Sequence, residues 1–296
     1  MKEIFMVFLG CLINGYTLDI MIKKNKDIGT LISICQIFFV TLCSFLLWIR
    51  NETRIRAPIK SYVQMGLLFF TVNIANLNSF AFGINHTLHI LIKSSSLIST
   101  LLIGSYFFSK KYSRKQIVSV IFITIGLFFI TVYDLYNPNK ITCCDTNHVE
   151  INSSLVQSMV GLFVMILALV ASSWLGFKQE ESYSFYKTDW LEGMFMTHLF
   201  CSLFSFTVIK NNLFEALEYS IAFWLFLNCL SHFVCITGVY VLNSKVGNLS
   251  CNVVLTLRKF TMILILSRLG SNVTFYHWIS SLLVFGGAFV FSTSFK

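Results

Sequence analysis

Long runs of apolar residues alternate with short polar connections along almost the whole chain of 296 residues. A helix needs about twenty mostly apolar residues to cross the hydrocarbon core of a bilayer. Runs of that length predict ten membrane-spanning helices. Their expected bounds are 4–22, 31–49, 62–83, 87–108, 117–133, 156–177, 192–209, 221–242, 247–267 and 275–294. We therefore predict an all-α polytopic membrane protein that forms a single transmembrane domain over residues 1–296.

Two apolar segments far apart in the chain share a pattern that indicates an internal duplication. Residues 121–131 read I-F-I-T-I-G-L-F-F-I-T and residues 281–291 read S-L-L-V-F-G-G-A-F-V-F, which aligns Gly126 with Gly286. The two pseudo-repeats are expected at about 1–135 and 155–296. With five helices each, an odd number, the two halves insert in opposite orientations, and transporters built in this way hold substrate near the bilayer midplane between them.

The composition agrees with a membrane protein and argues against a soluble one. Hydrophobic residues make up 56% of the chain and charged residues only 12%, whereas soluble domains carry about a quarter charged residues. The net charge of +9 would suit nucleic acid, but no soluble basic domain is present to hold it, so we expect no nucleic-acid partner. Most Lys and Arg outside the spans instead fall on the side of the N-terminus, which predicts that both termini are cytosolic.

Three cations lie inside predicted spans, where a buried charge costs about 3 kcal/mol. Lys93 lies in the fourth span, and Arg258 and Lys259 stand side by side near the middle of the ninth. Of the 13 acidic residues, only Asp19 is expected within a span, close to its end, so internal ion pairs cannot neutralise all three. We interpret the excess charge as a phosphate-binding site, because Arg binds phosphate bidentately and Lys attracts it as a point charge.

Polar residues extend from these cations along one face of each helix. In the fourth span, His86, His89, Lys93, Ser96 and Thr100 recur every three or four residues, as do Asn248, Asn252, Thr256 and Lys259 in the ninth. Asn73, Asn76 and Phe80 of the third span and Asn228, His232 and Cys235 of the eighth are candidates to line the same cavity. Two alternatives stay open: the polar side chains could serve as interhelical glue, and the cations could snorkel to the bilayer surface.

No arrangement typical of catalysis or metal binding occurs in the sequence. Ser, His and Asp do not recur as a triad, and paired carboxylates and clusters of Cys with His are missing. We therefore expect a protein that is not an enzyme and that holds neither a cofactor nor a metal. Cys143 and Cys144 share a polar loop and receive no role. The cysteines of the apolar segments are Cys11, Cys35, Cys43, Cys201, Cys229, Cys235 and Cys251, and we expect them to be small packing residues.

Several motifs occur in the same order as in a known family. They are F-F-T-V-N at 69–73, H-I-L-I-K-S-S-S-L-I at 89–98, K-K-Y-S at 110–113, T-L-R-K-F at 256–260 and H-W-I-S-S-L-L-V-F at 277–285. In these motifs the chain resembles the UDP-N-acetylglucosamine/UDP-xylose transporters, of the nucleotide-sugar branch of the drug/metabolite transporter superfamily. The resemblance implies ten helices in two inverted halves. It also implies antiport of a cytosolic nucleotide sugar for a luminal nucleoside monophosphate in the Golgi or endoplasmic reticulum membrane.

The resemblance also implies roles for individual residues. Lys93 and Ser94 match a basic–Ser pair of the fourth span, and Arg258 and Lys259 match a pair assigned to phosphate. Gln36 and Asn76 match further polar positions. The complete set of expected substrate-binding residues is Lys93, Ser94, Arg258, Lys259, Asn252, Thr256, Asn76, His89, Gln36 and His198.

The seventh span departs from the family pattern near the nucleoside. Related transporters carry a Phe-Tyr-Asn-His-like motif there, whereas this chain reads F-M-T-H at 195–198. The base is therefore open: UDP-N-acetylglucosamine is the first expected cargo and UDP-xylose the second. An adenine-nucleotide or sulfonucleotide exchanger of the same fold is one alternative, and a non-transporting membrane receptor or scaffold is another. The expected partners are the nucleotide sugar, the nucleoside monophosphate and membrane lipid, with a homodimer as a further option.

Overall fold

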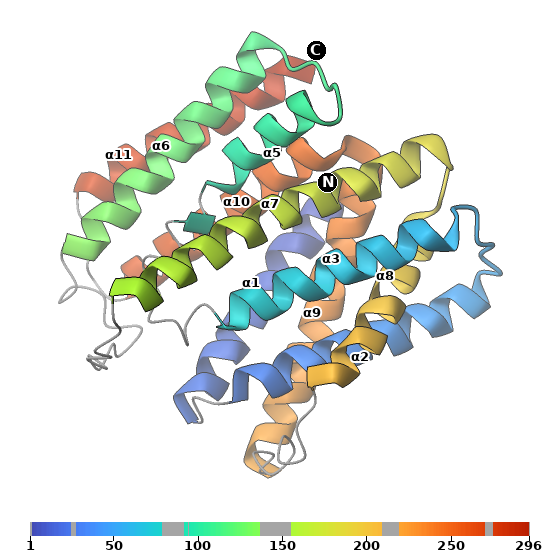
Figure 1. Ribbon diagram of the computed structural model, residues 1–296. Coiled ribbons are helices and arrows are strands. Elements are labelled where there is room, and N and C mark those ends of the chain that lie inside the picture. Colours follow the sequence, from blue (N-terminus) through green and yellow to red (C-terminus); the bar gives the residue numbers. More distant parts are fainter. Residues whose placement is uncertain are drawn as a thin grey trace. The chain divides into compact units, whose positions relative to one another are not determined.

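The computed structural model describes residues 2–24, 28–78, 92–93, 95–136, 155–208, 219–269 and 275–295. Throughout these ranges the secondary structure is helical and contains no β-strand (Figure 1). The α-helices are α1 (Lys2–Lys24), α2 (Gly29–Arg50), α3 (Ile59–Asn78), α5 (Ser96–Tyr106), α6 (Arg114–Tyr136), α7 (Leu155–Phe185), α8 (Trp190–Ser205), α9 (Tyr219–Val246), α10 (Asn248–Leu269) and α11 (Phe275–Ser292). The all-α fold class is confirmed, and each predicted span overlaps one of these helices.

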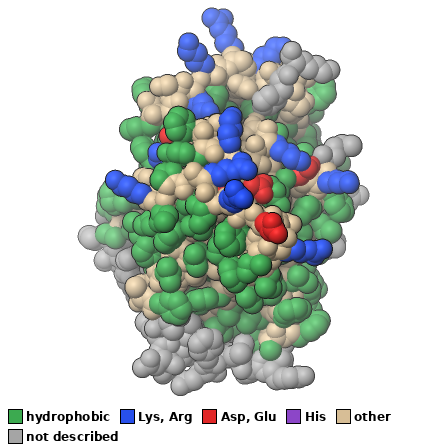
Figure 2. All heavy atoms as spheres, turned by 90° about the vertical axis from the view of Figure 1, so that its right-hand side faces the viewer, with side chains coloured by type: hydrophobic (Ala, Val, Ile, Leu, Met, Phe, Trp, Pro, Cys, Tyr) green, Lys and Arg blue, Asp and Glu red, His purple; other side chains and the backbone are tan. Residues whose placement is uncertain are grey.

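The surfaces of the helices are apolar, as a bilayer requires. Over the described residues, α2, α6, α7, α8, α9 and α11 are long and apolar enough to cross a membrane. Large side chains such as Phe163, Leu282 and Phe289 are exposed, and Figure 2 shows one face on which Lys and Arg gather beside a broad hydrophobic surface. So much exposed apolar area is unfavourable in water but is expected where lipid surrounds helices. The chain is therefore a multi-pass membrane protein.

The helices form two compact units that interleave along the chain. Unit 1 comprises Met1–Leu77 and Leu175–Cys251, and unit 2 comprises Asn78–Trp174 and Asn252–Lys296. Each unit thus draws helices from both expected pseudo-repeats. The spans expected to be counterparts, the fourth with the ninth and the fifth with the tenth, share unit 2 (apart from the first turn of α10).

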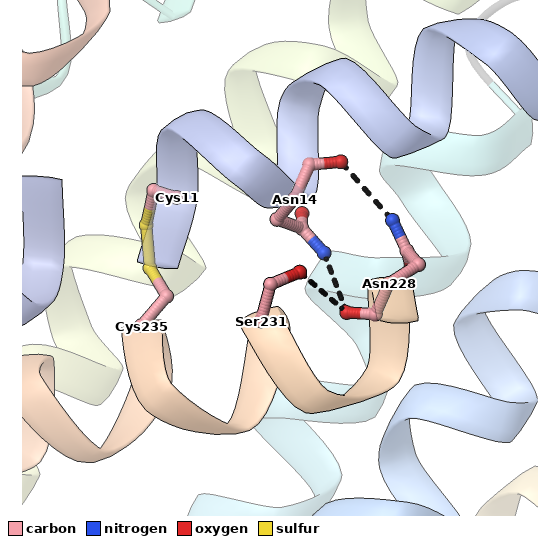
Figure 3. The surroundings of a disulfide bond; sticks show 5 residues. All are labelled: Cys11, Asn14, Asn228, Ser231 and Cys235. Atoms are coloured by element: carbon pink, nitrogen blue, oxygen red, sulfur yellow. Dashed lines mark hydrogen bonds between the residues drawn. A yellow bond between two sulfur atoms is a disulfide. The ribbon is translucent and has the colours of Figure 1, made fainter. Parts of the chain in front are cut away.

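In unit 1, α1 lies along α9 in a close antiparallel pair. Asn14 Nδ2 donates to the carbonyl of Asn228 at 3.1 Å, and Asn228 Nδ2 donates to the carbonyl of Asn14 at 3.0 Å (Figure 3). Close by, Cys11 and Cys235 form a disulfide, with their Cα atoms 5.2 Å apart. The expectation that these two cysteines are only packing residues is therefore wrong. Their pairing depends on the register of two helices that are distant in the sequence.

A single residue, Gly247, separates α9 from α10 in unit 1. Its φ of +79° lies in the left-handed region that favours glycine. The next N–H, that of Asn248, donates to Glu180 Oε2 at 2.8 Å, so a carboxylate of α7 caps the first turn of α10. The Asn248 side chain occupies the space where Gly176 lacks a Cβ. The start of α10 is thereby attached to α7.

In unit 2, α6 and α11 lie side by side through two glycines (Figure 1). A Cβ added to Gly126 would lie 2.8 Å from Val284, and one added to Gly287 would lie 2.9 Å from Ile123. A Cβ added to Gly286 would meet nothing within 4 Å. The glycine that corresponds to Gly126 in packing is therefore Gly287, one residue beyond the position aligned from the sequence.

Candidate functional site

Lys93, Arg258 and Lys259 come together in unit 2. Lys93 lies just before α5, and Arg258 and Lys259 lie midway along α10. All three side chains are partly buried. The charge of Arg258 acts on Lys93, and the charges of Lys93 and Arg258 both act on Lys259. The structure thus gathers into one group the three cations that the sequence placed inside predicted spans.

This cation group has no acidic partner among the described residues. The ion pairs between described side chains, Lys178 with Glu181 and Lys245 with Glu3, both lie in unit 1. Within the same part of the chain, Arg258 Nε is buried and makes no hydrogen bond. Three like charges gathered in a medium of low dielectric repel one another and lose hydration, so an anion placed among them would be strongly stabilised.

The N-terminus of α5 lies beside Lys93 in the sequence. Ile92 and Lys93 are helical, the N–H of Ser95 donates to the carbonyl of Ile92 at 3.1 Å, and α5 begins only at Ser96. Ser95, directly before α5, makes no side-chain capping hydrogen bond. The first N–H groups of a helix lack partners within it and favour an anion. Of the expected site residues, His89 and Ser94 lie outside the described residues.

A network of hydroxyl and amide groups joins α5, α7 and α10 in unit 2. Asn252 Nδ2 donates to Thr100 Oγ1 at 2.9 Å, Thr100 Oγ1 lies 3.3 Å from Ser173 Oγ, and Ser173 Oγ donates to Ser99 Oγ at 3.0 Å. Thr100 and Ser173 are buried, as is Thr256 one turn beyond Asn252 on α10. For Asn252, this is the interhelical glue that the sequence left open as an alternative. The network fixes how α10 packs against α5.

Gln36 belongs to a second polar network, which lies in unit 1. Its Nε2 donates to Asn228 Oδ1 at 2.7 Å, and Asn228 Nδ2 donates to Thr17 Oγ1 at 2.8 Å. Asn228 is completely buried and was itself expected to line a cavity. One N–H of Gln36 is thus committed to holding α2 against α9 and α1. A role for Gln36 toward substrate therefore rests on its carbonyl oxygen and its second N–H.

His198 lies in the core of unit 1. Its Nδ1 is 2.8 Å from the carbonyl of Met194, and its ring lies 4.8 Å from Phe69 and 5.7 Å from Tyr240. Within the described part of the chain, His198 Nε2 is buried without a hydrogen-bond partner. Asn76, on α3, is partly buried in the same unit. The described site residues thus form two sets: Gln36, Asn76 and His198 in unit 1, and Lys93, Asn252, Thr256, Arg258 and Lys259 in unit 2.

Glu192 is a buried carboxylate that sequence reasoning missed. It is the first residue of the predicted seventh span, lies in the first turn of α8 and is completely buried. Its Oε1 accepts hydrogen bonds from the N–H groups of Arg56 (2.6 Å) and Ala57 (3.3 Å) and from the hydroxyl of Tyr62. The expectation that only Asp19 lies within a span is therefore wrong. In the sequence, only the position of Glu192 at the edge of an apolar segment could have indicated its burial.

A small cavity lies between α2, α3 and the end of α8 in unit 1. Its polar lining consists of Thr30, Ser33, Asn73 and Ser205. Its volume of about 10 Å³ admits about one water molecule and is far smaller than a sugar. The charge distribution of unit 2, rather than a preformed cavity in unit 1, is therefore the stronger indication of a ligand.

Comparison with known proteins identifies the class of protein. Residues 1–295 match the UAA transporter family, so the chain belongs to this family of membrane transporters. A protein of known crystal structure aligns with 99% of this chain over 96% of its own chain. The TM-score is 0.72 and the sequence identity 11%, which shows a shared fold. The family and its characterised members are transporters, not enzymes.

Individual relatives narrow the kind of transporter. The UDP-N-acetylglucosamine transporter of Dictyostelium discoideum is 31% identical, over 99% of this chain and 91% of the relative. The endoplasmic reticulum GDP-fucose transporter of Drosophila melanogaster is 28% identical, over 97% and 88%. The UDP-xylose and UDP-N-acetylglucosamine transporter of Danio rerio is 25% identical, over 97% and 92%. The family of this chain therefore includes transporters of nucleotide sugars.

Proposed function

We propose that this chain is an antiporter that exchanges a cytosolic UDP-sugar for luminal UMP, with UDP-N-acetylglucosamine as its first cargo and UDP-xylose as its second. The observation that carries the proposal is the cation group of Lys93, Arg258 and Lys259, which no described carboxylate neutralises. A nucleotide diphosphate supplies the missing negative charge in a form that Arg and Lys both bind. The names of the relatives from Dictyostelium and Danio support this choice of cargo.

Within this site the three cations have distinct tasks. The guanidinium of Arg258 binds phosphate oxygens bidentately, and its unpartnered Nε is part of that donor set. Lys93 and Lys259 supply point charges from either side of it. The N-terminus of α5, with Ser94 before it, adds backbone donors to the same phosphates. Asn252 and Thr256 hold α10 and meet the ribose or sugar.

The nucleoside end of the cargo is assigned, from the sequence, to polar residues outside the cation group. Gln36, Asn76 and His198 are the polar candidates there, with His89 of the fourth span as a further one, and aromatic side chains stack on the base. His198 keeps one buried ring nitrogen without a partner among the described residues. These residues set specificity, whereas the cation group is common to any nucleotide.

Exchange of one anion for another follows from the same charges. An empty site leaves three cations unneutralised, so its reorientation across the membrane is disfavoured unless an anion is bound. We place ten spans in two inverted halves around the site, both termini in the cytosol, and the protein in the Golgi or endoplasmic reticulum membrane. A nucleoside monophosphate, which keeps one phosphate for the cation group, is the return cargo.

Counterflow in proteoliposomes tests the function directly. Vesicles preloaded with UMP are expected to accumulate UDP-N-acetylglucosamine faster than vesicles preloaded with ADP or adenosine bisphosphate, which represent the adenine-nucleotide and sulfonucleotide alternatives. A thermal-shift panel of nucleotides in detergent tests binding separately. Absence of any saturable nucleotide binding would instead favour a receptor or scaffold that kept the fold.

A guanosine nucleotide sugar is a further candidate cargo, beyond the two UDP-sugars. The relative from Drosophila is named for GDP-fucose, and the F-M-T-H sequence at 195–198 lacks the Tyr and Asn that related transporters carry near the nucleoside. Preloading with GMP and external GDP-fucose distinguishes this case in the same counterflow assay. Accumulation that depends on GMP and not on UMP would reassign the base and leave the cation group in its role.

A further inference from the structure

The connection from α5 to α6 concentrates positive charge. Lys110, Lys111, Arg114 and Lys115, here called the basic turn, all have exposed side chains. The sequence holds no Asp or Glu at all between Glu52 and Asp134. The basic turn therefore lies in a stretch of sequence without acidic residues, at the ends of two membrane helices.

The basic turn has a defined backbone conformation. The N–H of Lys110 donates to the carbonyl of Gly104 at 2.9 Å, and Ser109 before it has a φ of +50°. Ser113 and Gln116 cap α6 reciprocally: Ser113 N–H donates to Gln116 Oε1 at 3.0 Å, and Gln116 N–H donates to Ser113 Oγ at 3.3 Å. The positions from which the four side chains extend are therefore fixed.

Aromatic residues next to the basic turn fit the boundary between lipid and water. Tyr106 is 82% exposed and Phe107 is 67% exposed at the end of α5. The ring of Phe107 also lies 5.2 Å from that of Trp174, which anchors this segment to α7 within unit 2. Exposed aromatic rings at the end of a membrane helix are typical of the interfacial region. The cations that follow them then lie at the depth of the lipid headgroups.

We propose that the basic turn is a binding site for acidic phospholipid headgroups such as phosphatidylserine. A cluster of Lys and Arg directly beyond a membrane helix attracts anionic lipid, and each cation near such a surface raises affinity about fivefold. The positive-inside rule accounts for the side of the membrane on which the cations lie. It requires neither the fixed backbone, nor the adjacent exposed aromatic rings, nor the density of cations. The inference does not depend on which cargo is transported.

Two charge-matched triple variants test this site. Lys110→Gln/Lys111→Gln/Lys115→Gln removes three cations of the basic turn, and Arg50→Gln/Arg54→Gln/Lys60→Gln removes three exposed cations from the α2–α3 connection, where Glu52 is a neighbour. Purified protein is titrated in detergent with fluorescent phosphatidylserine, and with phosphatidylcholine as reference. Binding of phosphatidylserine is expected to weaken about 100-fold in the first variant and to stay within about twofold of wild type in the second.

Further measurements keep the outcome decisive. A Lys110→Arg/Lys111→Arg/Lys115→Arg variant keeps the charge and is expected to bind as wild type does, and the thermal unfolding midpoint of each variant shows whether it is folded. Inorganic phosphate at millimolar concentration is expected not to compete, because the site is for lipid in a membrane and not for the free ion. Equal losses in both glutamine variants would show a mere effect of net charge and overturn the proposal, as would no loss in the first.

Discussion

Buried charge is treated differently in the two units. In unit 1, the carboxylate of Glu192 receives two backbone N–H groups and the hydroxyl of Tyr62. In unit 2, the cations Lys93, Arg258 and Lys259 have no carboxylate among the described residues. A buried ion is stable when hydrogen bonds replace its lost hydration, and it is costly when nothing does so. The first arrangement is that of a structural element, and the second fits the anion-binding site that we propose.

The acidic side chains of unit 1 mostly bind backbone rather than cations. Glu180 caps the first turn of α10, and Glu192 holds the connection between α2 and α3 against α8. Both carboxylates therefore bind backbone at the junctions between helices. The protein therefore keeps its internal negative charge for its own architecture, and we expect substitutions in the two units to affect stability and transport separately.

The largest expected effect is that of Arg258→Ala. Loss of a bidentate contact to a desolvated phosphate is expected to cost about 3 kcal/mol, which lowers the exchange rate at least about 100-fold. Counterflow in proteoliposomes measures it, and the variant is expected to reach its membrane normally. Arg54→Ala, which removes an exposed arginine from unit 1, is the control. Exchange at the wild-type rate by Arg258→Ala would refute the phosphate assignment.

Glu192→Ala is expected to act on stability and not on nucleotide binding. The substitution leaves the N–H groups of Arg56 and Ala57 and the hydroxyl of Tyr62 without their buried acceptor, which costs about 2 kcal/mol. Thermal unfolding in detergent measures the loss. The shift of the unfolding midpoint on adding UMP is expected to stay as in wild type. A normal midpoint together with a lost nucleotide response would reverse the roles assigned to the two units.

Two neighbouring glycines of α11 test the packing of unit 2. Gly287→Val forces side-chain atoms into Ile123 and the carbonyl of Ser119 on α6, and is expected to destabilise by about 1.5 kcal/mol. Gly286→Val points into open space and is the matched control, expected to leave the unfolding midpoint close to wild type. The order is decisive: a larger effect at Gly286 would restore the register aligned from the sequence.

The smallest effect on stability is expected at the ion pair of Glu3 with Lys245. Glu3 precedes the first predicted span, and Lys245 lies between the eighth and the ninth. The hydrogen bond from Lys245, 2.6 Å long, lowers the pKa of Glu3 from 4.5 to about 2. A lowered pKa in the folded state means that the contribution to stability is complete above about pH 4.5 and is lost as the pH falls toward 2. The difference in unfolding midpoint between wild type and Glu3→Gln is therefore expected to be small and constant from pH 7 to 5. It is then expected to shrink below pH 4.5, and a difference that grows on acidification would contradict the assignment.

Much of the fold could be predicted because the thickness of the bilayer sets a similar length for every membrane-spanning helix. What hydropathy could not show is where polar contacts extend or interrupt a helix. Helix α7 continues beyond the predicted end at residue 177 to Phe185, and there Gln179 Nε2 donates to the Tyr240 hydroxyl at 3.1 Å. In the described part of the fourth span, Ser95 is a turn residue directly before α5. Both departures depend on individual polar side chains, whose effect is lost when hydropathy is averaged over a window of residues.

The grouping of the cations at the candidate site was predictable from charge alone. Lys93, Arg258 and Lys259 were identified because a cation inside an apolar segment costs free energy unless a partner or ligand offsets it. The structure brings the three together in unit 2. The burial of Glu192 was not predictable, since Arg56, Ala57 and Tyr62 are about 130 residues away in sequence. The commitment of Gln36 to Asn228 likewise depends on the register of helices that are far apart in the chain.

The pairing of α1 with α9 has a consequence for biosynthesis. The residues that meet across this pair, such as Cys11 and Cys235, are separated by 224 positions. During synthesis α1 therefore enters the membrane long before α9 has been made. Until then the amide of Asn14 lacks its hydrogen-bond acceptor, the carbonyl of Asn228. A protein truncated before α9 would leave the amide of Asn14 without its hydrogen-bond partner in the membrane. Such an unsatisfied polar group is a feature by which cellular quality control can recognise the truncated protein.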